Sequence, residues 1–434
     1  MAQDYDAVII GAGVIGAATA FELAKTGRRT LSVDKLPAAG YGPTSNSCAI
    51  IRVHYSTFDG TALAYEGYFY WKDWARYLDA EDERGLAGFN ECGCLIMRTE
   101  HNGHLERHCD LAAALDIPFE IWDRARIVEK LPVYDLKRFW PPKRMEQDGF
   151  GEPTGGEVES AVFFPTAGYI SDPQLATHNL QRAAEAKGSE FLFGREVVEI
   201  LKSDGRVSGV KLDDGAEIPA PVVINVAGPH SAQINAMAGA AGDMKITTRA
   251  LRQEVVHVPS PEGFDFERLG TVVSDSDIGC YCRPETGNHI LVGSEDPECD
   301  PREFVDADAY DREFTDQWTH QAHRMGQRIP TLGIPNRTRG AVDLYDVTED
   351  WIPIYDRSQV PGFYMAIGSS GNQFKNAPVA AKMMAALVDY CEAGGDHDAE
   401  PLQFPLDHIG RSIDVGFYSR LREINAESSF SVLG

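Results

Sequence analysis

The chain has 434 residues, more than one ordinary core accommodates, and we expect two or three lobes. Its net charge of −26 leaves no basic face for nucleic acid or an anionic membrane surface, so neither is expected as a partner. No apolar stretch reaches the ~18 residues of a membrane span and no signal-peptide pattern precedes the first strand, which predicts a cytoplasmic protein. The eight cysteines include no C-x-x-C pair, so we expect reduced structural thiols and no metal site.

The first predicted unit is a strand, a helix and a second strand, with a glycine-rich turn after the first strand. Residues 6–10 are an apolar run of strand length, and residues 11–16 are Gly-Ala-Gly-Val-Ile-Gly. Helix-forming residues 17–25 follow, and a second strand at residues 30–34 ends in an acid. This order predicts a dinucleotide-binding βαβ unit. The alternative, a glycine-rich turn without a ligand, is disfavoured by the flanking elements.

The glycines and the acid of this unit each have a physical role. Gly11 permits the tight turn, Gly13 lets the backbone approach a pyrophosphate, and Gly16 lets the helix pack on the strand. Free N–H groups at the start of the helix would receive the phosphate charge. Asp34 would accept hydrogen bonds from ribose hydroxyls and would repel a 2′-phosphate, which disfavours NADP.

Two further segments complete the first part of the chain. Residues 36–47 are rich in turn formers and hydroxyls and precede the apolar residues 48–51 and Arg52. A loop beside a cofactor fits this composition, and a plain surface loop is the alternative. Residues 61–78 form an aromatic-rich helix, whose 3 and 4 spacing predicts burial against another lobe.

The middle of the chain alternates short strands and helices. We expect a strand at 94–97, a helix at 104–115 and a Pro- and Gly-rich linker at 141–156. A turn-rich stretch from 163 to 173 leads to a helix at 174–187. The strands expected next, of which the last three form a small β-meander, are 190–193, 195–200, 207–212 and 217–218.

An apolar strand at 221–227 ends in Ala227 and Gly228, two residues with almost no side chain. Such an ending lets backbone approach a ligand. Together with the first βαβ unit, it suggests that two distant segments of one sheet face a single extended cofactor.

The rest of the chain supplies a second lobe and a return to the first. A helix is expected at 308–329, a strand at 363–368 and a helix at 377–391, and the intervening loop offers N–H donors suited to an anionic reduced flavin. The tail beyond residue 394 ends in a helix-like stretch at 417–424 and could be an oligomer arm or cover the cofactor domain. The further strands expected for the second lobe are 254–258, 271–274, 279–283 and 289–293.

Four stretches resemble one known family: residues 11–16 with Asp34, 44–52, 226–229 and 367–375. They are similar to the FAD-dependent amine and amino-acid oxidoreductases, the family of D-amino acid oxidase, glycine oxidase, sarcosine oxidase and dimethylglycine dehydrogenase. The last two form the branch that the chain resembles most.

The resemblance implies an α/β chain, α+β overall, with a discontinuous Rossmann-like FAD-binding domain and an antiparallel-sheet substrate domain. The FAD-binding domain would comprise residues 1–82, 158–236 and 337–393. The substrate domain would comprise residues 83–157 and 237–336, and residues 394–434 would form a C-terminal tail.

The resemblance also implies site residues. Arg52 and Lys375 would hold the substrate carboxylate, and Tyr345 and Glu295 would complete the catalytic set. The residues expected to contact FAD are Gly11, Gly13, Val14, Ile15, Gly16, Asp34, Lys35, Thr44, Ser45, Asn46, Cys48, Ala49, Ile51, Val197, Ala227, Gly228, Gly340, Gly368, Gly371, Asn372, Gln373, Phe374 and Lys375.

The chain departs from the sarcosine oxidase pattern at four positions. Ala49 replaces a second arginine. Asp343 stands where relatives carry the cysteine that tethers FAD, so we expect FAD to be held without a covalent bond. Leu291 and Glu295 stand near the positions of a lysine that assists oxygen activation and of an active-site histidine, which puts oxidase activity in doubt.

The expected reaction is hydride transfer to flavin N5 from the carbon beside a secondary or tertiary amine of an N-alkyl amino acid. The resulting imine would be hydrolysed by water. Alternatives are oxidation of a primary amino acid, a flavin-bearing subunit of a hetero-oligomer that is inactive alone, and an NAD enzyme, which only the first βαβ unit supports. The partner is a small-molecule substrate, and a homo-oligomer is possible.

Overall fold

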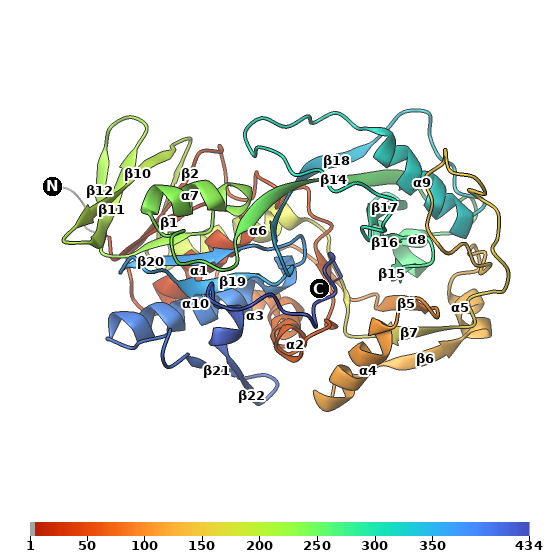
Figure 1. Cartoon of the computed structure of the whole chain (residues 1–434), viewed down its shortest axis with the longest axis horizontal. Coiled ribbons are helices and arrows are strands. Elements are labelled where there is room, and N and C mark those ends of the chain that lie inside the picture. The colour runs from red at the N-terminus through yellow and green to blue at the C-terminus, as the bar shows by residue number, and fades with distance from the viewer. Residues whose placement is uncertain (1–4, 434) are drawn as a thin grey trace.

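The computed structural model describes residues 5–433, and residues 1–4 and 434 lie outside the described part. Two lobes lie side by side, one built on a mainly parallel sheet with helices and the other on a large mixed sheet (Figure 1). The expected class, α/β with an antiparallel-rich second sheet, is confirmed. Among the described residues no helix is both long and apolar enough to cross a membrane.

The first lobe contains a six-stranded sheet whose neighbours are all parallel except β19 and β20. In spatial order its strands are β19 (Ile354–Arg357), β20 (Phe363–Ile367), β13 (Val223–Asn225), β1 (Ala7–Ile10), β2 (Thr30–Asp34) and β9 (Glu190–Phe193). Strand β1 lies inside the sheet, and all four of its residues are buried. Its uninterrupted apolar sequence is what a parallel strand covered on both faces requires.

Helix α1 (Val14–Lys25) contacts both α6 (Pro173–Ala186) and α10 (Ala377–Glu392). Its alanines are almost completely buried, which lets two neighbouring helices approach its backbone closely. A three-stranded β-meander adjoins this lobe, as predicted. Its strands, and the elements that follow β13, are β10 (Val197–Ser203), β11 (Arg206–Leu212), β12 (Glu217–Pro219), η1 (Gly228–His230) and α7 (Ser231–Ala238).

The second lobe contains an eight-stranded sheet in which only β5 and β15 are parallel neighbours. In spatial order its strands are β18 (Gly340–Thr348), β14 (Thr248–Pro259), β17 (His289–Ser294), β16 (Cys280–Glu285), β15 (Val272–Asp275), β5 (Cys94–Arg98), β7 (Ser160–Phe164) and β6 (Glu120–Asp123). The helices of this part are α4 (His104–Ala114), α5 (Arg124–Lys130), α8 (Phe266–Leu269) and α9 (Asp316–Arg328), of which α9 packs on β14, β16 and β17.

Two further small sheets lie apart from the large sheets of the two lobes. Strand β8 (Gly168–Ile170) lies between β3 (Ile50–Ile51) and β4 (Phe89–Asn90). The remaining elements are α2 (Phe58–Lys72), α3 (Trp74–Leu78), η2 (Phe374–Asn376), β21 (Gln403–Leu406), β22 (Arg411–Asp414) and η3 (Val415–Tyr418).

The proposed domain boundaries stay predictions, but sheet membership bears on two of them. Strands β7 and β18 both belong to the eight-stranded sheet of the second lobe. The boundaries at 158 and 337 assigned these residues to the FAD-binding domain, so the chain crosses between the lobes later than the sequence suggested.

Three element predictions are wrong in detail. The helix expected from 308 begins only at Asp316, because the Thr315 side chain caps it by accepting from the Gln317 N–H. The aromatic helix is divided at Asp73, whose φ of −114° and ψ of 46° lie outside the helical region. Phe163 and Phe164 are the end of strand β7, not a turn.

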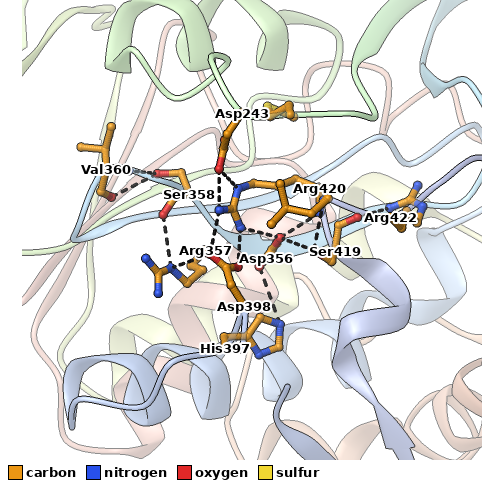
Figure 2. Close-up of polar contacts among 12 residues, drawn as sticks. Asp243, Asp356, Arg357, Ser358, Val360, His397, Asp398, Ser419, Arg420 and Arg422 are labelled. Carbon is orange, nitrogen blue, oxygen red and sulfur yellow. Dashed lines mark hydrogen bonds and ion pairs between the residues drawn. The ribbon is translucent and has the colours of Figure 1, made fainter. Parts of the chain in front are cut away.

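The helix-like stretch expected at 417–424 is helical only at its start, in the short 3₁₀ helix η3, and Arg420 lies beyond the end of that helix in a group of ion pairs. Figure 2 shows Arg420 surrounded by the carboxylates of Asp243, Asp356 and Asp398. The Arg420 side chain is buried, and its nitrogens lie 2.6 to 3.0 Å from these oxygens. Removing one partner would leave an uncompensated buried charge. Arg420 therefore anchors the tail to the first lobe.

Candidate cofactor and substrate site

A cavity of about 340 Å³ lies between the two sheets. At one end it is lined by Ile10, Val33 and Val226, at or just beyond the carboxyl ends of β1, β2 and β13. At the other end it reaches Val273 and Tyr345 of the eight-stranded sheet. Ligands of open α/β sheets bind at the carboxyl ends of the strands, so the cavity is placed where a cofactor would span from one lobe to the other.

The three motif glycines differ in what a side chain would meet. At Gly11, where φ is +110°, a Cβ would lie 2.5 Å from the Val226 carbonyl oxygen. At Gly16 it would lie 2.1 Å from the Gly11 carbonyl oxygen, so both positions require glycine for packing of the chain itself. At Gly13 a Cβ would meet only the Thr44 hydroxyl, at 3.1 Å, and the residue lines the cavity. Gly11 and Gly16 are therefore needed for the fold, whereas Gly13 leaves room for a ligand to approach the backbone.

Asp34 lies at the cavity wall with both carboxylate oxygens held by backbone. One accepts from the Ala12 N–H at 2.7 Å and the other from the Leu36 N–H at 2.8 Å. Burial raises the pKa of Asp34 from its usual value. Because each oxygen has a further lone pair, the fixed carboxylate can still accept hydrogen bonds from a diol. Lys35 also lines the cavity, and its Nζ donates to the Asp308 carboxylate at 2.6 Å.

The loop after β2 places four of its expected cofactor residues at the cavity. They are Thr44, Asn46, Cys48 and Ala49. The Thr44 hydroxyl accepts from the Val14 N–H at 3.2 Å, which ties this loop to the start of α1. Ala49 has a φ of 47°, the left-handed region that residues with a Cβ rarely adopt. The loop is therefore held in one conformation beside the glycine turn.

Three later segments complete the cofactor end. Val197, Ala227 and Gly228 line the cavity, and Gly228 has a φ of +55° with open space where a Cβ would lie. Gly371 is required by a close approach, because a Cβ there would lie 2.4 Å from the Tyr345 ring. The other expected residues that line the cavity are Val14, Ile15, Asn372, Gln373, Phe374 and Lys375.

Six expected site residues do not line the cavity. Gly340 is at the exposed start of β18, where a Cβ would lie 1.8 Å from the Val255 carbonyl oxygen, so its glycine serves strand pairing. Glu295 lies behind the wall and accepts from Ser274 at 2.6 Å, while Ser274 itself lines the cavity. Burial raises the pKa of Glu295 to about 7. The other four are Gly16, Ser45, Ile51 and Gly368.

Arg52 is a buried cation at the cavity. Its side chain donates to the backbone carbonyl of His54 and, through Nη2, to that of Val432 at 2.9 Å. The guanidinium carbon lies 4.3 Å from the centre of the Tyr55 ring. Burial lowers the pKa of Arg52 from its usual value. Within residues 5–433, Arg52 forms no ion pair with a carboxylate.

Lys375 is the second buried basic side chain at the same cavity, with 3% of its surface exposed. Its Nζ donates to the Tyr55 hydroxyl at 2.9 Å and to the Asn372 carbonyl at 2.7 Å. Burial, and then the charge of Arg52, hold the pKa of Lys375 well below its usual value. Lys375 likewise has no carboxylate partner among the described residues. In this part of the chain, two buried basic side chains without carboxylate partners therefore face one cavity.

Tyr345, expected in the catalytic set, lines the cavity together with Tyr281 and Cys48. The Cys48 Sγ lies 3.6 Å from the Tyr281 hydroxyl. Burial raises the pKa of all three groups, so these phenols and this thiol are protonated at neutral pH. They offer hydrogen-bond donors to the cavity and no negative charge.

Sequence reasoning missed several residues of the substrate end. Tyr55, which contacts both basic side chains, and His54, which lines the cavity, closely follow Arg52 in the chain. Their proximity to Arg52 was a signal that could have found them. Val432 and Leu433, from the opposite end of the chain, also line the cavity, and no sequence motif marks them.

The comparison with protein families decides the cofactor. The family described as FAD dependent oxidoreductase, the D-amino acid oxidase type, matches residues 6–387. The chain belongs to this family. It is an FAD-dependent oxidoreductase, and the cavity suits FAD because it joins the glycine turn at Gly13 and the diol acceptor Asp34 to a wall of the second lobe.

Curated relatives are distant but extensive. Glycine oxidase of Geobacillus kaustophilus (strain HTA426) is 25% identical over 95% of this chain and 99% of its own length. The 4-methylaminobutanoate oxidase (formaldehyde-forming) of Paenarthrobacter nicotinovorans is 26% identical over 91% of this chain, which spans only 45% of that protein. N-methyl-L-tryptophan oxidase of Yersinia pestis (strain Pestoides F) is 24% identical over 49% of this chain and 50% of its own length. All three are named as oxidases of an amino acid or of an N-methyl amino acid.

Solved structures confirm the fold. L-proline dehydrogenase from P. horikoshii superimposes with a TM-score of 0.75 at 22% identity, over 97% of this chain and 98% of that one. Glycine oxidase from Geobacillus kaustophilus gives a TM-score of 0.73 at 21% identity, over 97% and 100%. L-alpha-glycerophosphate oxidase from Mycoplasma pneumoniae, solved with FAD bound, gives 0.71 at 18% identity, over 89% and 95%.

Proposed function

We propose that this enzyme oxidises the amine of a small N-alkyl amino acid, of the sarcosine or dimethylglycine kind, and that Arg52 and Lys375 bind the substrate carboxylate. The observation that supports this proposal is the pair of buried basic side chains at one cavity, to which the described residues offer only neutral oxygens. A buried charge without a counterion is costly, and an anionic ligand would relieve that cost.

The rest of the site fits such a substrate. FAD, when bound, supplies an acceptor for the hydride that leaves the carbon beside the amine nitrogen. Arg52 and Lys375 would fix the carboxylate and thereby orient that carbon. The protonated Tyr281, Tyr345 and Cys48 add no negative charge that would repel a carboxylate. Water then hydrolyses the imine. When the oxidised carbon belongs to the N-alkyl group of a secondary amine, this hydrolysis releases the group as an aldehyde.

Little acid–base machinery is needed at the site. A neutral amine donates the hydride directly, so the chain has only to bind the amine in its unprotonated form. Glu295, which touches the cavity wall through Ser274, would act as a positioning group and not as a base that contacts substrate. Tyr345 would contact the cofactor or the substrate from the wall of the second lobe.

Oxidation of a primary amino acid is the second candidate, because the match to glycine oxidase covers 99% of that protein. One experiment separates the candidates. The visible spectrum of the purified enzyme is recorded before and after anaerobic addition of sarcosine, dimethylglycine, glycine, proline and methylamine. Bleaching by N-methyl amino acids alone supports the proposal. Bleaching by glycine alone favours the second candidate, and bleaching by methylamine as fast as by sarcosine contradicts a carboxylate clamp.

The cellular location and the oligomeric state stay predictions. A cytoplasmic protein is expected from the sequence, and either a homo-oligomer or a flavin-bearing subunit of a larger complex is compatible with the site. Gel filtration of the isolated chain, combined with the anaerobic bleaching above, tests the subunit alternative, because an isolated subunit that needs a partner would not bleach.

A further inference from the structure

The segment 429–433 closes the substrate end of the cavity. Figure 1 shows the C-terminal end of the chain between the two lobes. Val432 and Leu433 line the cavity together with Arg52. The Val432 carbonyl accepts from Arg52 Nη2 at 2.9 Å, and the Val432 side chain belongs to a small buried cluster with Cys48 and Tyr281. The tail therefore occupies a donor of the guanidinium to which the proposed function assigns the substrate carboxylate.

Up to Ser428 the tail is held firmly, and Asp350 is the main attachment. Arg422 donates to the Asp350 carboxylate at 2.9 and 2.8 Å. The Ser428 hydroxyl donates to the Asp350 carbonyl at 2.5 Å, and the Asn425 N–H reaches the carboxylate at 3.3 Å. Asp350 itself is fully buried. This attachment, with that of Arg420, fixes where the following residues begin.

Beyond Ser428 the attachment is much lighter. Arg302 Nη2 donates to the Phe430 carbonyl at 2.7 Å, and Arg52 Nη2 donates to the Val432 carbonyl at 2.9 Å. Among the described residues, these two hydrogen bonds and the packing of the Val432 side chain hold the segment over the cavity. The segment can therefore leave the cavity while Ser428 stays attached.

We propose that residues 429–433 form a strap that occupies Arg52 when no substrate is present and is displaced when a carboxylate binds there, so that the strap selects for carboxylated amines. This inference rests on the proposed carboxylate clamp. A carboxylate makes charge-assisted hydrogen bonds to a guanidinium, which are roughly twice as strong as those of a neutral carbonyl. A simple amine has no group to replace the Val432 carbonyl at Arg52, and it would leave Val432 and Leu433 in the cavity.

The first test follows the strap in the holoenzyme by hydrogen exchange. The probe is acetate, the smallest organic carboxylate after formate, and sodium chloride at equal ionic strength is the control. We expect acetate to speed exchange of the amides of residues 430–433, and that of the buried Val432 above all, because displacement exposes this residue to solvent. Chloride should leave exchange unchanged. Unchanged or slower exchange in saturating acetate would overturn the strap.

The second test loosens the strap without touching the clamp. Arg302→Ala removes the bond to Phe430, and a chain that stops after Ser428 lacks the strap but keeps its anchor. Loss of a competing neutral hydrogen bond should tighten acetate binding about two- to ten-fold, measured from the perturbation of the flavin spectrum. Arg249→Ala is the matched control, since Arg249 packs on the Phe304 ring in the same lobe and has no contact with the strap. Equal or weaker acetate binding in both strap variants would refute the strap.

Arg52→Ala separates failure of the strap from failure of the clamp. If acetate binding is lost in Arg52→Ala but unchanged in the strap variants, the clamp stands and the strap is wrong. If acetate binding does not depend on Arg52, the clamp itself is wrong, and the strap falls with it.

Discussion

The Nζ of Lys375 lies 2.9 Å from the hydroxyl oxygen of Tyr55, and the same aromatic ring lies under the guanidinium of Arg52. Tyr55 also donates to the Asn372 carbonyl at 2.6 Å. One ring thus connects two basic side chains that are more than three hundred residues apart in the sequence. Burial raises the pKa of Tyr55 to about 12, so the phenol remains a neutral partner for both.

The first prediction concerns Arg52. A charge-assisted hydrogen bond to the substrate carboxylate contributes about 1.5 to 3 kcal/mol. Arg52→Ala should therefore lower kcat/KM for a carboxylated substrate roughly ten- to a hundred-fold. The kcat/KM for the matching decarboxylated amine should hardly change. Steady-state kinetics on the two substrates checks this, and a thermal melt controls for the lost bonds to His54 and Val432. Equal losses on both substrates would show that Arg52 supports the flavin or the fold.

The second prediction uses the glycine turn. Gly13→Ala should fold normally and purify without flavin, because its Cβ meets only the Thr44 hydroxyl within the chain but intrudes on the cavity. Gly16→Ala is the matched comparison, since its Cβ would lie 2.1 Å from the Gly11 carbonyl oxygen and should impair folding itself. Soluble yield, circular dichroism and the ratio of flavin to protein absorbance measure both effects. Full flavin content in Gly13→Ala would contradict the placement of the pyrophosphate.

The course of the chain near Gly13 was predictable because its signals are local. Strand β1, the glycine turn and α1 follow one another directly, and each has its own pattern of apolar or small residues. Strand β18 was missed for the opposite reason. Asp343 and Asp346 interrupt its apolar alternation, and both line the cavity. Polar residues placed for the site therefore obscure the sequence pattern of the strand.

The substrate end was only half predictable. The resemblance pointed to Arg52 and Lys375, but it gave no hint of what covers them. The bond between Arg52 and Val432 joins positions 380 residues apart, and that between Lys375 and Tyr55 joins positions 320 apart. Contacts at such separation depend on how both lobes pack, which no local pattern records.

The third prediction is that FAD is released on acid denaturation. Asp343 stands at the expected tethering position, and it accepts from Asn46 at 2.6 Å. Two cysteines do line the cavity, but burial raises the pKa of the Cys48 thiol and raises that of Cys94 to about 12, so neither is a thiolate. Flavin should appear in the supernatant after precipitation with trichloroacetic acid. The prediction would be contradicted if flavin stayed with the pellet of the unmodified enzyme and was absent from the pellet of the Cys48→Ser variant.

The fourth prediction concerns the electron acceptor. Electron transfer to oxygen is helped by a cation near the flavin, and Leu291 supplies none. Lys375 is a weak substitute, since its depressed pKa favours the neutral amine. An artificial dye should therefore reoxidise the reduced enzyme much faster than oxygen does, as stopped-flow absorbance would show. Peroxide formation that keeps pace with amine turnover in air would point instead to Arg52 or Lys375 as the required cation.

The fifth prediction is a pH dependence of carboxylate binding. Burial and Arg52 hold the pKa of free Lys375 well below its usual value, whereas a bound carboxylate would raise that pKa again. Binding then takes up a proton at any pH above the free pKa and below the bound one. In that window the affinity for acetate should fall as pH rises, by up to ten-fold per unit, and it should be constant below the free pKa.

Two variants identify the titrating group. Lys375→Met should abolish the slope assigned to Lys375. Glu295 titrates near pH 7, and its charge would also oppose a carboxylate near Arg52, so it could produce a slope of the same sign. Glu295→Gln should therefore remove only the part of the slope near pH 7. Acetate titrations of the flavin spectrum from pH 5.5 to about 9.5 give the profile. An affinity that is flat, or that rises with pH, would show that no buried ammonium binds the carboxylate.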